Sequence, residues 1–217
     1  LGNIPVLFDN DANVSARGEL RYGAAKNYRD FIYVTVGTGI GGGIYIDGEL
    51  LQGPRWCASE VGHMVMLPSG PACSCGGQGC LETLAAAPAI VREGRVEALK
   101  NPSSILHKMA ENNQGQITAE MVSSAYEKGD EAASIAFART SGWLGIGMAN
   151  LVNIFNPSLL VIGGGVSLAG EKLLRIVREK IDKYAMGVQK EHVRVTTSAL
   201  KDKAGMYGAI AYALDNL

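Results

Sequence analysis

Of all residue types, glycine places the strongest constraint on the fold of this chain, because glycines cluster at the ends of apolar runs. The chain has 28 glycines among 217 residues, and clusters lie at residues 37–43, 76–79 and 163–165. This share is about 13%, against a usual share of ~7%. Since the clusters have no fixed period, collagen and low-complexity sequence are excluded. Such clusters mark places where the backbone turns tightly or lies against a ligand.

The runs between these clusters predict alternating strands and helices. β-branched and aromatic stretches indicate strands, and apolar residues at helical spacing indicate helices. Strands are expected at 4–8, 31–36, 44–46, 49–51, 159–162 and 193–197, and helices at 12–22, in several pieces across 84–127, and at 130–155, 171–184 and 204–214. Residues 53–82 lack strong helical periodicity and are expected to form a long functional loop. This alternation predicts an α/β fold with a mixed sheet.

Composition and charge narrow the function classes. The 20 Lys and Arg residues balance 21 Asp and Glu residues, which argues against a strongly basic nucleic-acid binder or an acidic tail. No apolar run reaches the ~18 residues of a membrane span, and no export signal is present. The chain is therefore expected to be cytoplasmic. Because it begins with Leu1, we expect a processed chain or part of a longer protein.

Two carboxylates and two amides stand together between the first expected strand and the first helix, in the stretch Asp9-Asn10-Asp11-Ala12-Asn13. Asp and Asn are preferred helix N-caps, and capping alone would explain them. A carboxylate at a strand end can also act as a general base toward a hydroxyl group, with an amide orienting the same hydroxyl. Both interpretations stay open on the sequence alone.

The glycine-rich stretch at 37–43 joins two expected strands, so it is neither a Walker A loop nor a Rossmann turn. A bulged hairpin would explain two or three of its glycines. The remaining glycines expose backbone N–H groups that can cradle phosphate oxygens, with Thr38 adding a hydroxyl. The third cluster, at 163–165, ends an apolar strand. It indicates either a tight turn or close approach to a flat or phosphorylated ligand.

Three cysteines fall within eight positions, at Cys73, Cys75 and Cys80, and His63 lies ten residues upstream. Three thiols and one imidazole form the ligand set of a closed, structural zinc site. The alternatives are buried reduced thiols and an ordinary core or surface histidine. Cys57 is expected to stay a free thiol, and His107 and His192 are expected at the surface. Glu60 and Glu82 flank the loop, but spacing alone does not single them out from solvated acids.

Taken in order, these motifs resemble the ROK family. That family combines bacterial sugar kinases, including glucokinase-like and N-acylhexosamine kinases, with sugar-responsive repressors. The resemblance spans residues 4–214 and rests on the Asn10-Asp11-Ala12-Asn13 stretch, the Thr35–Gly43 glycine turn, the Glu60-x-Gly62-His63 stretch, the Cys73-x-Cys75-Gly76-x-x-Gly79-Cys80-x-Glu82 stretch, the Ile162–Gly165 strand end and the Ala204-Gly205-x-x-Gly208-Ala209 helix start.

The resemblance implies an actin-like, ribonuclease-H-like fold with two lobes around a cleft, and ATP-dependent phosphorylation of a hexose, glucose at its C6 hydroxyl. It implies Asp11 as the catalytic base, sugar contacts from Asn10, Asp11, Glu60, His63 and Glu82, and ATP with Mg²⁺ at Gly37, Thr38, Gly39, Gly41, Gly163, Gly164 and Gly165. It also implies structural Zn²⁺ at His63, Cys73, Cys75 and Cys80.

The chain departs from the family pattern at two points. The Asp-x-Gly-x-Thr turn that opens the family's N-terminal lobe is absent, so we expect residues 1–217 to be the C-terminal part, with roughly a hundred residues missing upstream. Ser59 stands where the family commonly has glycine. A repressor with an upstream helix-turn-helix and an N-acetylhexosamine kinase are the alternatives. The resemblance also implies a homodimer and neither a membrane nor a nucleic-acid partner for this segment.

Overall fold

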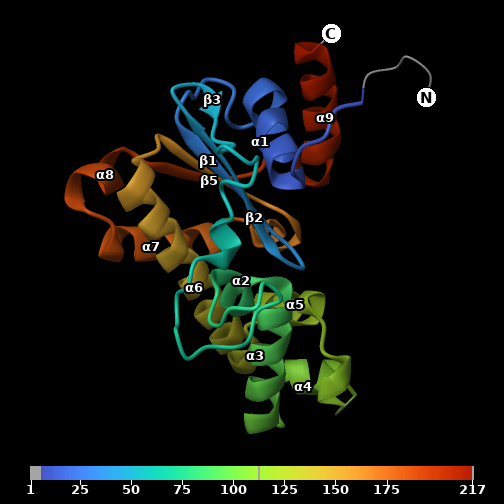
Figure 1. Cartoon of the computed structure of the whole chain (residues 1–217). Helices are drawn as coiled ribbons and strands as arrows, with labels where there is room; N and C mark the ends of the chain where they lie inside the picture. The colour runs from blue at the N-terminus through green and yellow to red at the C-terminus, as the bar shows by residue number, and fades with distance from the viewer. Residues whose placement is uncertain (1–5, 112, 217) are drawn as a thin grey trace.

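A mixed β-sheet lies at the centre of the protein (Figure 1), whose computed structural model describes residues 6–111 and 113–216. The described strands form one sheet in the order β3-β2-β1-β4-β5. Their bounds are β1 (Phe31–Val36), β2 (Ile40–Ile46), β3 (Glu49–Leu50), β4 (Leu159–Gly163) and β5 (Arg194–Thr197). β1 pairs antiparallel with β2 and parallel with β4, and β4 pairs parallel with β5. The α/β fold with a mixed sheet is confirmed.

Helices cover both faces of the sheet and extend beyond one end of it. Their bounds are α1 (Asp11–Tyr22), α2 (Leu81–Ala85), α3 (Ala87–Lys100), α4 (Ile105–Met109), α5 (Ala119–Glu127), α6 (Glu131–Phe155), α7 (Glu171–Tyr184), α8 (Gly187–His192) and α9 (Ala204–Asp215). Short 3₁₀ turns are η1 (Val61–His63), η2 (Gln114–Gln116), η3 (Gly165–Ala169) and η4 (Lys201–Lys203). In Figure 1, α1 and α9 lie together beside the sheet, while α2, α3, α4 and α5 gather around one end of α6.

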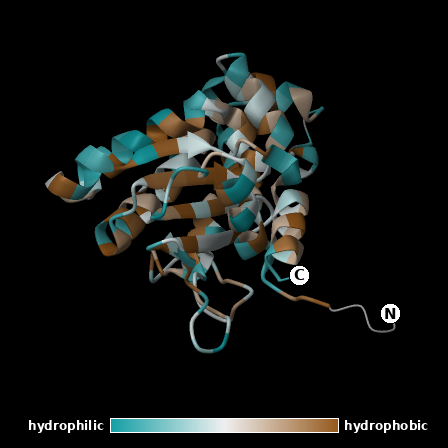
Figure 2. Ribbon diagram, turned by 90° about the horizontal axis from the view of Figure 1, so that it is seen from above, coloured by the Kyte–Doolittle hydropathy of each residue, from teal (hydrophilic) through white to brown (hydrophobic). Residues whose placement is uncertain are grey.

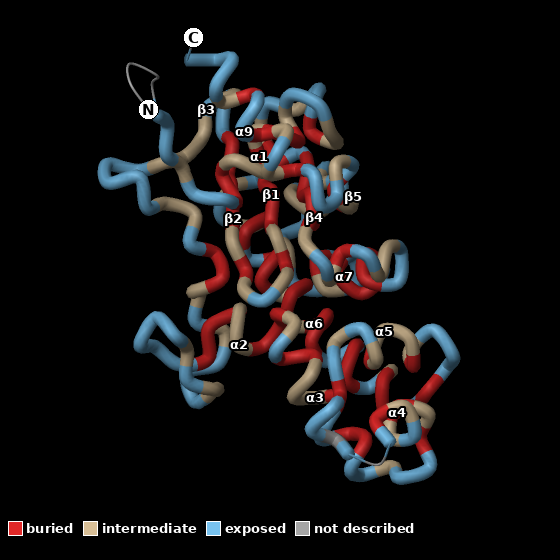
Figure 3. The backbone as a smooth tube through the Cα atoms, turned by 90° about the vertical axis from the view of Figure 1, so that its right-hand side faces the viewer, coloured by how far each residue is buried: buried red, intermediate tan, exposed pale blue. Residues whose placement is uncertain are grey.

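The strands bury both faces, as the alternation of their side chains requires. Phe31 and Tyr33 point to the α1 side, whereas Ile32 and Val34 point to the side covered by α6 and α7. Figure 3 shows buried backbone concentrated along β1, β4 and α6, and Figure 2 shows apolar residues running along the strands between the more mixed helices. Because both faces are covered, the ends of the strands are the places left for a ligand.

α6 joins the sheet to a second core, formed mainly by α3, α4, α5 and the first turns of α6 itself. Asp130 caps α6 by accepting the N–H of Ala133 at 2.9 Å, and it also accepts the N–H of Ile105 at 2.6 Å. The helix ends at Phe155, and the next residue, Asn156, has a φ of +47°, the left-handed conformation that terminates a helix before a proline. One helix thereby holds the two cores together.

The structure differs from the predicted elements at one expected strand and at one helix that was not predicted. Residues 6–8 of the expected strand 4–8 are irregular and exposed, with Phe8 at 83%, because no strand lies beside them among the described residues; residues 4 and 5 lie outside the described part. α8 was not predicted, since this short helix buries no residue and so has no apolar periodicity. None of the described helices combines the length and the apolar character needed to cross a bilayer.

Candidate functional site

The turn between β1 and β2 exposes backbone donors at one end of the sheet. Gly37 donates its N–H to the carbonyl of Gly39 at 2.9 Å, which closes the turn. Within the described residues, the N–H groups of Thr38 and Gly39 have no hydrogen-bond acceptor. A Cβ atom at Gly37 would meet nothing within 4 Å, so this side of the turn is open. Such a turn can receive the oxygens of a phosphate group.

α1 begins beside this turn because glycines in β2 let the helix approach closely. A Cβ at Gly43 would lie 2.6 Å from Cβ of Ala16, and a Cβ at Gly41 would lie 3.0 Å from Cβ of Ala12. Both distances are too short for a larger residue. The part of the glycine stretch inside β2 therefore serves helix packing as well as turning.

The start of α1 carries the predicted Asn and Asp pair. The side-chain oxygen of Asn10 accepts the N–H groups of Ala12 at 2.8 Å and Asn13 at 3.4 Å, so Asn10 is the N-cap. The capping interpretation is confirmed for this oxygen. The carboxylate of Asp11 is exposed and has no hydrogen-bond partner among the described residues. It is free to accept a proton or a hydroxyl hydrogen bond.

The loop after β3 brings the four predicted metal ligands together. One ligand atom from each of His63, Cys73, Cys75 and Cys80 lies within 4.8 Å of the others. Nδ1 of His63 is 3.6 Å from Sγ of Cys73, and Sγ of Cys75 is 3.7 Å from Sγ of Cys80. Tetrahedral zinc with Zn–S bonds of ~2.3 Å places neighbouring sulfurs ~3.8 Å apart. The donor set and its spacing fit zinc.

The surroundings of the cluster shift the pKa values of two of its thiols in opposite directions. A hydrogen bond from the backbone N–H of Cys75 lowers the pKa of Cys73 to about 7. Burial raises the pKa of Cys80 to about 12. In the metal-free chain Cys73 therefore ionises at a lower pH than Cys80.

The two glutamates that spacing could not single out both lie at the cluster. Oε2 of Glu60 is 4.0 Å from Nε2 of His63, on the ring edge opposite the cysteines, and its side chain is 55% exposed. Oε2 of Glu82 accepts the N–H of Ile40 at 2.9 Å, just after the β1–β2 turn. Glu60, His63 and Glu82 thus form one polar group next to that turn.

The third glycine cluster closes the opposite side of the turn. Gly163 packs under the ring of Tyr33, and Gly164, with φ of +78°, packs on Val36, so neither position has room for a side chain. Gly165 is open, and a Cβ there would meet nothing within 4 Å. Of the three, Gly165 is the one that faces a cavity.

A cavity of about 550 Å³ lies between this cluster, the β1–β2 turn and α5. Its apolar wall includes Ile90, Phe137 and Val166, and its polar side comes from α5. The α5 residues are Glu120, Ser123, Ser124 and Glu127. Sequence patterns did not single out these residues, because acids and serines on an amphipathic helix are indistinguishable from a solvated face.

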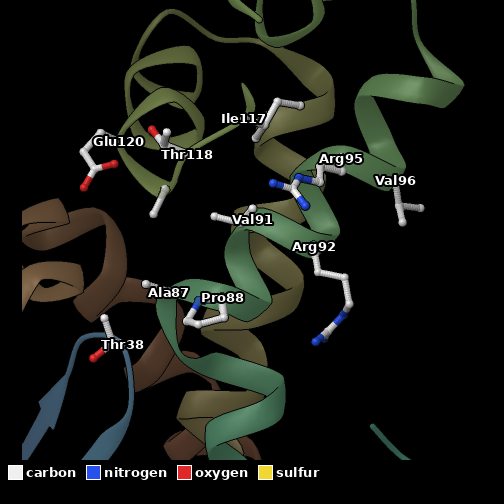
Figure 4. Close-up of a pocket in the computed structure, with 11 residues that line it drawn as sticks. Thr38, Ala87, Pro88, Val91, Arg92, Arg95, Val96, Ile117, Thr118 and Glu120 are labelled. Atoms are coloured by element: carbon white, nitrogen blue, oxygen red, sulfur yellow. The ribbon is translucent and has the colours of Figure 1, made fainter. Parts of the chain in front are cut away.

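A second groove of about 650 Å³ adjoins this cavity at Thr38, Ala87 and Glu120. Figure 4 shows it between α3, with Arg92 and Arg95, and the start of α5. In this view Thr38 lies below the start of α5, near Ala87 and Pro88 at the start of α3. The turn thereby borders an extended surface rather than a single closed pocket.

A model of the ROK family matches residues 2–216, and the chain belongs to this family. The fold is that of ROK sugar kinases, the actin-like fold. A crystal structure of a ROK glucokinase from Streptomyces griseus in complex with glucose and AMPPNP superposes with a TM-score of 0.90 at 36% identity, covering 98% of this chain and 69% of that one.

Curated relatives include both kinases and repressors. A glucokinase of Halalkalibacterium halodurans is 37% identical over 206 residues, which is 94% of this chain and 62% of that protein. A xylose repressor of Caldicellulosiruptor bescii is 35% identical over 215 residues, which is 99% of this chain and 53% of that protein. The chain thus spans less than two thirds of the length of these relatives.

Proposed function

We propose that this protein transfers the γ-phosphoryl group of ATP to a hexose, with glucose at its C6 hydroxyl as the preferred acceptor. The observation that carries the proposal is the free carboxylate of Asp11 at the start of α1, which packs against β2 beside the open Gly37–Thr38–Gly39 turn. Phosphoryl transfer needs a positioned acceptor and a phosphate cradle, and this arrangement offers both.

Asp11 would act as the general base. Its carboxylate accepts the proton of the sugar hydroxyl, the oxygen forms a bond to the γ-phosphorus, and the bond from that phosphorus to the β–γ bridging oxygen breaks to release ADP. The N–H groups of Thr38 and Gly39 would stabilise the charge on the transferred group. Mg²⁺ arriving with ATP would supply further charge neutralisation.

The sugar would lie between the start of α1 and the metal loop. In this arrangement Asp11 and the amide nitrogen of Asn10 would contact the sugar from the α1 side, and Glu60, His63 and Glu82 would contact it from the side of the metal loop. Carboxylates and an imidazole match the hydroxyl donors of a sugar. The cavity of about 550 Å³ would hold the adenosine, with Gly165, the glycine of the third cluster that faces it, letting the backbone come close to the ligand. Gly163 and Gly164, which were expected to contact the nucleotide as well, pack on Tyr33 and Val36 and would only support this turn.

Zinc at His63, Cys73, Cys75 and Cys80 would be structural. A set of three thiolates and one imidazole fills the tetrahedron and leaves no position for a reacting water. The metal would hold Nδ1 of His63 and so orient Nε2, the atom that faces Glu60, toward the substrate.

The test is sugar-stimulated ADP release by the full-length protein with a panel of hexoses and N-acetylhexosamines. Wild type should release ADP with at least one sugar, and Asp11→Asn should lower kcat by a factor of about 10² to 10⁴ while nucleotide binding persists. Glu49→Gln, on the remote strand β3, is the matched control. No release with any of these sugars would contradict the proposal.

A sugar-sensing repressor is the second candidate, favoured by the repressor relatives that align with 99% of this chain. In that case the same cleft would bind a sugar without transferring phosphate. Sugar binding by calorimetry with no ADP release, together with sugar-dependent binding to operator DNA by the full-length protein, would favour the repressor. We further propose that the protein forms a homodimer, which sedimentation of the full-length protein would test.

A further inference from the structure

Glu82 touches two functional regions at once. It lies two residues after Cys80, in the first turn of α2. One carboxylate oxygen accepts the N–H of Ile40 at 2.9 Å, and the other lies 4.0 Å from Sγ of Cys73. A single side chain therefore connects the metal loop to the end of the turn that exposes the free N–H groups.

The same turn is held by two neighbouring contacts. Gly62, next to His63, packs on the carbonyl of Ile40 so closely that a Cβ there would lie 2.1 Å from that oxygen. At the other end of the turn, the N–H of Ala87 donates to the carbonyl of Gly37 at 2.8 Å. The metal loop, through Gly62, and the start of α3, through Ala87, thus hold the turn from two sides.

Glu82 also packs directly against the backbone of the turn. A Cβ at Gly39 would lie 2.5 Å from Oε2 of Glu82, so the carboxylate rests directly against the Gly39 backbone. Ile40 is only 4% exposed, and its N–H would lose its acceptor in a buried place if Glu82 moved away. Leaving such a group unpaired is costly.

From these contacts we propose that Glu82 is a positioning residue that transmits the order of the metal loop to the phosphate turn. Metal bound at the cluster then supports nucleotide binding as well as sugar binding. The proposal rests on the proposed function, because it takes the turn to be the phosphate site. A Glu82 that only contacts sugar would leave the turn unaffected by its replacement.

The first experiment measures amide hydrogen exchange at residues 37–40 in the 217-residue chain, with zinc and after chelation. In wild type, chelation should speed exchange of the Ile40 amide by roughly tenfold. Glu82→Ala should show this fast exchange already with zinc bound, and chelation should add little. Glu82→Gln keeps an acceptor oxygen and should restore most of the protection. Glu60→Ala, which removes a carboxylate of the same loop that does not touch the turn, is the control.

The second measurement is calorimetric titration with MgADP in the absence of sugar. Glu82→Ala should weaken the Kd by roughly five- to tenfold, and Glu82→Gln by less than about twofold. Unchanged exchange at residues 37–40 on chelation in wild type overturns the proposal, whether or not Glu82→Ala folds. A different outcome is that chelation speeds exchange at residues 37–40 as expected but MgADP does not bind. That result would support the link between the metal loop and the turn and would contradict the phosphate-binding role of the turn.

Discussion

Ser59, in the loop before the metal cluster, has an unusual backbone angle. Its φ of +68° lies in the left-handed region that glycine adopts at no cost. Its carbonyl packs against Gly42, since a Cβ at Gly42 would lie 2.7 Å from that oxygen. The turn is thus fixed by contact with β2, and the serine accepts a strained conformation. This is the position at which the resemblance predicts glycine.

Ser59→Gly should therefore stabilise the chain. Relief of the strain outweighs the added freedom of glycine and the loss of the 3.3 Å hydrogen bond from Oγ to the Leu51 carbonyl. We expect a gain of about 0.5–1 kcal/mol in the free energy of unfolding, or about 1–3 °C in Tm. Ser69→Gly, in the same loop without a positive φ, should give no gain. Equal effects of the two substitutions in thermal denaturation would contradict the explanation.

The two shifted thiols should differ in reactivity when metal is absent. A thiol with a pKa of about 7 is largely thiolate at pH 8, whereas one near 12 is not. Iodoacetamide should therefore modify Cys73 well before Cys80 in the chelated chain at pH 8. The Cys73 rate should rise with pH, reach half of its plateau near pH 7 and level off about one pH unit higher. Fragmentation mass spectrometry locates the label, and faster labelling of Cys80 would contradict the assignment.

Among individual residues, the metal ligands could be predicted from the sequence, whereas the contacts that hold the β1–β2 turn could not. Cys73, Cys75 and Cys80 are close in sequence, so a short loop suffices to gather them, and His63 follows from the need for a fourth ligand. The bond from Ile40 to Glu82 joins residues 42 positions apart and depends on where α2 lies against β2. No local pattern encodes such a contact.

At the level of secondary-structure elements, glycines allow α1 and α9 to cross with their backbones in close contact. A Cβ at Gly208 would lie 1.7 Å from the carbonyl oxygen of Val14, and one at Gly18 would lie 2.5 Å from that of Ala204. Each helix thus offers a glycine to the backbone of the other. This accounts for one glycine of the Ala204-Gly205-x-x-Gly208-Ala209 stretch, while Gly205 has ordinary space around it.

Gly208→Ala should destabilise the chain by about 2–4 kcal/mol, because the backbones of both helices would have to separate. Gly205→Ala makes the same chemical change one turn earlier, where its Cβ would lie 3.7 Å from Oγ of Ser15. It should be neutral or stabilising by up to about 1 kcal/mol through helix propensity. Urea denaturation of the two variants measures the difference, and similar midpoints would rule out the close crossing.

The long elements were predictable because their periodicity reports burial. β1, β4, α6 and α7 bury regular faces, and their expected bounds agree with the observed ones within about two residues. β3 and α8 were shortened or missed, since neither buries a continuous face. The order of the strands depends on contacts across the chain, and the sequence pattern alone specified only that the sheet is mixed.

Across the whole molecule, the described apolar cores lie in the sheet layers and the helical part, and the metal loop is outside them. None of residues 66–80 belongs to the three clusters of buried apolar side chains. Of this range, Met66 packs against one cluster as a partly buried neighbour. In Figure 3 much of the backbone around these residues is exposed. The folded form of this loop therefore depends on the metal cluster and a few backbone bonds, whereas the sheet does not.

Zinc removal should accordingly unfold part of the molecule and leave the rest intact. Protein prepared without chelator should contain about one zinc per chain, and Cys75→Ser should contain less than about 0.2. Chelation of wild type or the Cys75→Ser change should abolish exchange protection across residues 61–80 and speed exchange at the 37–40 turn. Amides of β1 and β4 should keep their protection, because their cores are separate.

The control is Cys57→Ser, which replaces an exposed cysteine outside the cluster and should retain zinc and all protection. Full zinc content in Cys75→Ser, or global loss of protection on chelation, would contradict a structural metal that orders only this loop and the adjacent turn.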